Sequence, residues 1–131
     1  MPYYLLNVYL FTDKHLEAVR LNPNHPQALD SLARVRATSG MPRLRDGGAA
    51  VELADKANQL TGYSQPEFLD TLAAAYAEVG RFPEAVQTSQ KAMELARSHG
   101  KAELARDIGS RLRLYQAGRP YHGGLGKVKS P

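Results

Sequence analysis

The feature that most constrains this chain is an internal repeat of helix-forming segments. Setting Pro26 against Pro66 aligns two leucines, an alanine and a glycine in the same order: Leu29, Leu32, Ala33 and Gly40 with Leu69, Leu72, Ala73 and Gly80. The segments that follow align Ala50, Ala54 and Ala57 with Ala85, Ser89 and Ala92. Leucines three residues apart give one helix an apolar face, and alanines four and three apart let a second helix approach it closely. The repeat therefore predicts a helical hairpin that is used twice.

The composition favours helix throughout. The 131 residues include 18 Ala and 17 Leu, against 13 Val, Ile and Thr together, a balance that disfavours strands. Glycines follow these segments and prolines precede several of them, as is typical of helix ends and first turns. Ser64 and Glu67 also have the spacing of a capping box. We expect an all-α chain with helices near 4–21, 26–39, 47–61, 66–79, 83–98 and 101–117. Any Ala/Leu-rich helix could align with itself in this way, but the matching glycines and prolines favour a true repeat.

The second hairpin resembles the tetratricopeptide repeat (TPR) family. Between Pro66 and His99 it carries the family's small and large packing residues in order: Leu69, Leu72, Ala73, Tyr76, Gly80, Arg81, Phe82, Ala85 and Ala92. The resemblance implies a right-handed α-solenoid of antiparallel helical hairpins. The first hairpin departs from the family's period of about 34 residues, because its loop between Gly40 and Ala50 is longer. The ending of the chain is also similar to C-terminal repeat arrays of bacterial TPR proteins.

On this pattern the chain holds about two and a half repeats and a capping helix. We expect a partial repeat at 1–25, repeats at 26–65 and 66–99, a capping helix at 100–118 and a flexible basic tail at 119–131. Leu104, Ile108, Leu112 and Tyr115 form the single apolar stripe of that capping helix. Met1–Leu10 either caps the array, which we favour, or forms an exposed patch through which the half-repeat associates with a partner. The missing half-repeat suggests the C-terminal part of a longer array.

The sequence contains no arrangement typical of a catalytic, metal or cofactor site. The chain has no cysteine, which excludes disulfides, thiolate metal sites and a cysteine nucleophile. Its four histidines have no metal-binding spacing, and 123–127 does not match a phosphate-binding loop. Asp30 and Asp70 occupy equivalent repeat positions and could be an acid–base pair, but repetition explains the equivalence, so a solvated face is preferred. We expect a protein that is not an enzyme.

The net charge of +4 is unevenly placed. Up to Gly100 there are 10 basic and 11 acidic residues, and after it 7 basic and 2 acidic. We expect no nucleic-acid binding, because the basic end lacks dense lysine and arginine interleaved with aromatic residues. It also lacks a large apolar face, so no membrane insertion is expected. A cytoplasmic location fits the absence of cysteine and of a signal peptide.

Recognition is the function that the resemblance implies. In stacked hairpins the first helix of each pair lines a concave groove. The groove residues expected from the family pattern are Gln27, Asp30, Ser31, Arg34, Thr38, Glu67, Asp70, Thr71, Ala74 and Glu78. Their acidic bias favours a basic or polar peptide, with a merely soluble face as the alternative. We expect a non-catalytic protein-binding or scaffold module. The competing hypothesis is a C-terminal fragment of a TPR-bearing enzyme, such as a glycosyltransferase, with catalysis outside this chain.

Overall fold

The structure is built from helices joined by short turns. The computed structural model describes residues 13–123. It contains α2 (Pro26–Thr38), the 3-10 helix η1 (Pro42–Leu44), α3 (Gly47–Leu60), α4 (Pro66–Glu78), α5 (Phe82–Ser98) and α6 (Ala102–Gln116). Residues 13–21 are also helical, and no strand occurs between 13 and 123. The prediction of an all-α chain is therefore confirmed for this range.

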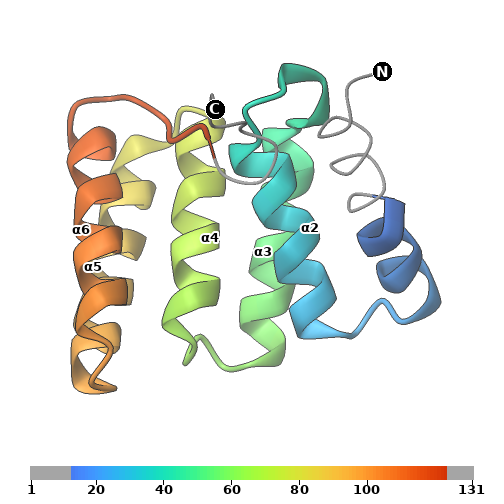
Figure 1. The fold of residues 1–131 in the computed structure, drawn as a ribbon, viewed down its shortest axis with the longest axis horizontal. Helices are drawn as coiled ribbons and strands as arrows, with labels where there is room; N and C mark the ends of the chain where they lie inside the picture. Colours follow the sequence, from blue (N-terminus) through green and yellow to red (C-terminus); the bar gives the residue numbers. More distant parts are fainter. Residues whose placement is uncertain (1–12, 124–131) are drawn as a thin grey trace, which may run out of the picture.

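The helices lie in two layers. α2, α4 and α6 run side by side in one direction, and α3 and α5 return behind them (Figure 1). α2 contacts α3 and α4, α4 also contacts α3, α5 and α6, and α5 contacts α6. We call the side of α2, α4 and α6 that faces away from α3 and α5 the front face. Its three helices begin at the same end of the molecule.

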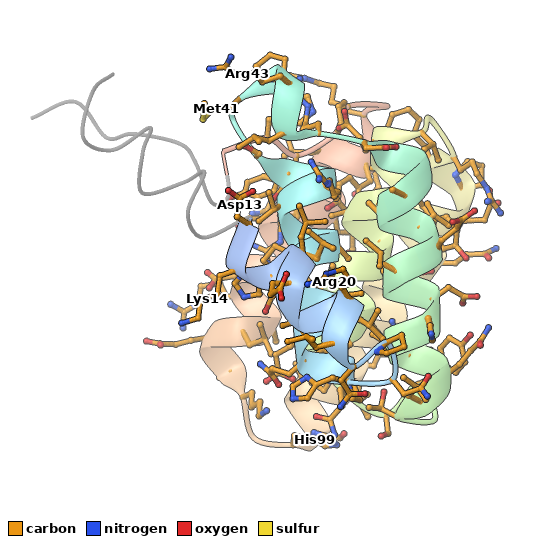
Figure 2. The ribbon with its side chains drawn as sticks, turned by 90° about the vertical axis from the view of Figure 1, so that its right-hand side faces the viewer. Asp13, Lys14, Arg20, Met41, Arg43 and His99 are labelled. Atoms are coloured by element: carbon orange, nitrogen blue, oxygen red, sulfur yellow. The ribbon has the colours of Figure 1, made fainter. Side chains whose placement is uncertain are left out.

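The connections alternate between the two ends of the array. Figure 2 views it from its N-terminal side, with the helix that carries Asp13, Lys14 and Arg20 nearest the viewer. Met41 and Arg43 lie in the α2–α3 connection at one end, and His99 lies in the α5–α6 turn at the other. The front-face helices therefore all begin at the end where His99 lies.

The aligned repeat positions form the core. Leu29 of α2 and Ala57 of α3 form one buried cluster with Phe68 of α4. One hairpin further on, the aligned residues Leu69 of α4 and Ala92 of α5 cluster with side chains of α6. All the aligned alanines and leucines, and Ser89, are buried. Small residues let the helices approach closely, so the repeat in the sequence corresponds to a repeat in packing.

From residue 26 onward, each expected helix is present with ends that differ by at most one residue. Gly62, Gly80, Gly100 and Gly118 have the positive φ expected after a helix. Gly40 does not. Ser39, which ends α2, already has an extended ψ of 136°, and the chain continues into η1.

The expected capping box at the start of α4 is absent. The residue that precedes the helix is Gln65, so Glu67 lies one position too early for the box. Ser64 instead donates its hydroxyl hydrogen bond to the Thr61 carbonyl at 2.7 Å. The carboxylate of Glu67 pairs with Lys101.

Residues 119–123, which we call the C-terminal strap, return across the helix layer (Figure 1). The Gly123 amide donates to the Thr38 carbonyl at 2.8 Å, and His122 Nε2 lies 2.6 Å from Glu78 Oε2. The Arg111 guanidinium lies over the Tyr121 ring, 5.5 Å from its centroid. The sequence placed these residues in a flexible tail, but in the structure they contact α2, α4 and α6.

Some predicted features lie outside the described residues. These are the first part of the helix predicted near 4–21, up to residue 12, the cap or patch at Met1–Leu10, and the remainder of the basic tail at 124–131. Within 13–123, no helix has both the length and the apolar character needed to cross a membrane.

Candidate functional site

The ten residues predicted to line a groove come from α2 and α4, but they differ in exposure. Gln27 is exposed, and Ser31, Arg34, Glu67 and Glu78 are partly exposed. The buried members of the set are Asp30, Thr38, Asp70, Thr71 and Ala74. Ala74 packs in a cluster of buried alanines with Ala37 and Ala50. Half of the expected groove is therefore interior, and a ligand would meet only part of it.

Asp70 is held by arginines from both neighbouring helices. Its side chain is only 3% exposed, and Arg111 of α6 contacts both carboxylate oxygens, at 3.1 and 2.6 Å. Arg34 of α2 approaches the same carboxylate at 3.8 Å. Burial opposes the charge on Arg111, but the adjacent Asp70 carboxylate outweighs it and the net pKa shift of Arg111 is upward. This charge is thus neutralised within the chain.

Arg34 also joins α2 to α4 by hydrogen bonds. Its Nη2 donates to the Thr71 hydroxyl at 2.8 Å and to the Glu67 carbonyl at 3.4 Å. Thr71 in turn donates to the Glu67 carbonyl at 3.2 Å. Arg34 and Thr71 therefore position the helices and have little remaining capacity for a ligand.

The two glutamates at the ends of α4 are paired as well. Lys101 Nζ lies 2.6 Å from Glu67 Oε2. Partial burial would raise the pKa of Glu67, but the hydrogen bond from Lys101 prevails and the net shift is downward. At the other end, Glu78 accepts from Arg45 Nε at 3.1 Å and contacts His122 of the strap.

Asp30 differs from these carboxylates. It is 7% exposed, and its Oδ1 has no hydrogen-bond partner within the described part of the chain. Burial raises the pKa of Asp30 from 3.8 to about 6, and the positive charge of Arg34 and a hydrogen bond from Thr71 only partly oppose this rise. Glu67 Oε1 is also buried without a hydrogen-bond partner. Two carboxylate oxygens at this end of the front face therefore lack donors.

These two residues line a hollow of about 530 Å³ between the first turns of α2 and α4. The walls combine the apolar surfaces of one prolyl ring and one phenyl ring with polar side chains. The lining residues are His25, Pro26, Gln27, Asp30, Thr61, Gln65, Glu67 and Phe68. Opposite, the strap lies on Thr38 and Glu78, at the far ends of α2 and α4. The open part of the predicted groove is thus its N-terminal end.

The basic partners of the front face were not predicted from the sequence. Arg111 was counted only in the basic excess after Gly100, and Arg45, Lys101 and His122 were given no role. Arg111 lies off the apolar stripe of its helix, and this position was the signal in the sequence that it could pair with another helix. Its partner lies 41 residues away in the chain, so only the packing of α6 on α4 reveals the pair.

The described residues contain no group of three or more His, Asp or Glu side chains placed to hold a metal ion. No protein-family model matches the chain, and neither a curated protein nor a solved structure is significantly similar to it. The site must therefore be interpreted from its own geometry.

Proposed function

We propose that this chain is a non-catalytic helical-repeat module of the TPR type that binds a segment of a partner protein across its front face. Three features support the proposal. The hairpin is repeated in sequence and in packing. The first helices of the hairpins lie together in one layer. The carboxylates of Glu67, Asp70 and Glu78 are engaged by basic residues, an arrangement that stabilises the layer and does not favour acid–base chemistry.

The hollow at the N-terminal ends of α2 and α4 is the observation that carries this proposal. It is concave, partly apolar and bordered by polar groups, which is the usual character of a recognition pocket. The C-terminal strap covers the opposite end of the same face. We therefore place the anchor of a bound segment in the hollow, with the segment continuing along the open surface of α2 and α4.

The experiment is a selection of random peptides displayed on phage, followed by calorimetric titration of the selected peptides. The informative variant is Gln27→Lys, because Gln27 is exposed on the wall of the hollow. A lysine there stands one turn from Asp30, so its ammonium group can occupy the hollow from within the chain. We expect the selected peptides to bind this variant at least about tenfold more weakly, the loss of one charge-assisted contact.

The matched control is Gln90→Lys, the same substitution at an exposed position of α5 in the rear layer. Peptides should bind this variant as they bind the wild type. Failure to select any peptide, or equal weakening by both substitutions, would contradict binding at the front face.

A further inference from the structure

Asp30 stands out among the carboxylates of the predicted groove. The other three acidic residues of that set, Glu67, Asp70 and Glu78, each have a basic partner of this chain within 3.1 Å. Asp30 has none, and its carboxyl group is nevertheless largely removed from water. Thr71 lies within hydrogen-bonding reach of the Asp30 carboxyl group, but Oδ1 has no donor. A buried carboxylate oxygen without a donor is costly. A hydrogen-bond donor supplied by a bound partner molecule would remove that cost.

The chain itself is poorly placed to supply this donor. α4, which packs beside Asp30, contains no lysine or arginine. Arg34, one turn further along α2, directs Nη2 to Thr71 and to the Glu67 carbonyl. Lys101 contacts the Oε2 of Glu67 and leaves Oε1 without a partner. The acceptors at the hollow therefore exceed the donors that reach them.

We propose that the hollow receives a lysine or arginine side chain of the bound segment, with the carboxylates of Asp30 and Glu67 as acceptors for its cationic group. This inference rests on the proposed function and names the chemistry of its anchor residue. Phe68 and Pro26 line the same hollow and offer apolar surface for the aliphatic stem of such a side chain. An amide or hydroxyl of similar size would satisfy the hydrogen bonds but not the charge.

Protonation of Asp30 provides an independent signature. A cation binds its ionised form, so lowering the pH through about 6 must weaken binding. If Asp30 alone controls binding, the affinity for a cationic side chain should fall about tenfold between about pH 7 and about pH 5. The charged or titratable groups facing Asp30 are Arg34 on its own helix and Glu67 and Asp70 on α4. His25 lines the same hollow.

The test uses the whole chain and short peptides with blocked ends, in which a single lysine, arginine or norleucine is flanked by glycines. Binding is followed by NMR shifts of backbone amides in the first turns of α2 and α4. We expect the lysine or arginine peptide to shift these amides and to bind at least about tenfold more tightly than the norleucine peptide. Asp30→Asn should remove this preference and the pH dependence together.

His25→Asn is the control for the histidine. His25 Nδ1 accepts the Ala28 amide at 3.0 Å as the helix cap, and asparagine is an equally good cap. The pH dependence should persist in this variant. If it disappears here and persists in Asp30→Asn, the assignment to Asp30 is wrong.

The two proposals fail in different ways. Equal binding of lysine and norleucine peptides overturns the cationic anchor. If selected peptides without lysine or arginine still bind the front face, the module function stands without that anchor. If no peptide is selected at all, the module function itself fails.

Discussion

Two aspartates at equivalent repeat positions have opposite electrostatic surroundings. Asp70 is bound by Arg111 and approached by Arg34, whereas Asp30 has no ion pair within the described residues. The difference arises from the next front-face helix along the chain: α6, which packs beside Asp70, contains three arginines, whereas α4, which packs beside Asp30, contains no basic residue. The repeated position is therefore structural in one hairpin and open to a ligand in the other.

The raised pKa of Asp30 predicts how stability depends on pH. In the unfolded chain its pKa is near 3.8 and in the folded chain about 6, so the folded state binds the proton more tightly. Its contribution to stability is fully present below about pH 4 and is lost as the pH rises through 6. Relative to Asp30→Asn, the wild type should lose on the order of 2–3 kcal/mol of unfolding free energy between about pH 4 and about pH 8.

Urea unfolding of the wild type and Asp30→Asn across this pH range measures the difference in their unfolding free energies. The contributions of titratable groups that the two proteins share cancel in this difference. Parallel stability curves for wild type and variant would show that Asp30 titrates normally in the folded chain.

Among the elements, the lengthened α2–α3 connection has a definite structural role. It includes η1, whose Leu44 is buried. It also brings Arg45 to Glu78 at 3.1 Å while Arg45 Nη1 donates to the Ser39 carbonyl at 2.7 Å. The added residues thus tie the end of α2 to the end of α4.

The start of α3 gives a prediction with an adjacent control. A Cβ on Gly47 would lie 2.6 Å from Val79 Cγ1 and 3.1 Å from Glu78 Cγ, whereas a Cβ on Gly48 would meet only Asp46 Oδ1 at 3.8 Å. Gly47→Ala should therefore destabilise the fold by about 1–2 kcal/mol, the range of overpacking. Gly48→Ala should be neutral or stabilise it by up to about 1 kcal/mol through helix propensity.

Thermal or urea unfolding of the two single variants separates the effects. Equal stability of the two variants would mean that the close approach of α3 to the end of α4 is not maintained.

For the whole molecule, the front-face layer is joined by charge as well as by packing. Arg34, Asp70 and Arg111 connect α2, α4 and α6, while the strap crosses from α6 to α2. These contacts span 33 or more residues of sequence, so they form only when consecutive hairpins dock.

Arg111→Ala tests the importance of this connection. It leaves the buried Asp70 carboxylate with Arg34 at 3.8 Å as its remaining partner. We expect a loss of about 3 kcal/mol of unfolding free energy, near the lower end of the cost of breaking a buried pair. Arg106 occupies an exposed position of the same helix. Arg106→Ala should therefore change the unfolding free energy by less than about 0.5 kcal/mol.

The comparison is made by urea unfolding at a single pH. Similar losses in the two variants would show that the ion pair does not hold the layer together.

The sequence alone predicts the positions of the helices well, but it does not predict the contacts of the candidate site. Leucines three apart, alanines four and three apart, and glycines after each segment were sufficient to predict the helices from 26 onward to within one residue. These signals are local, because helix formation and termination depend on residues within a turn or two. The long-range partners of the candidate site have no such local signal.

The tertiary structure decided which of the predicted groove residues a ligand can reach. Thr38 and Ala74 are buried by neighbouring helices and Glu78 is engaged by the strap, although each has the sequence position of a groove residue. Asp30 and Asp70 could not be distinguished by pattern, since their difference depends on a guanidinium 41 residues beyond Asp70. Helix position follows from local sequence, whereas charge pairing and burial depend on which helices dock, and that docking separates a structural aspartate from an available one.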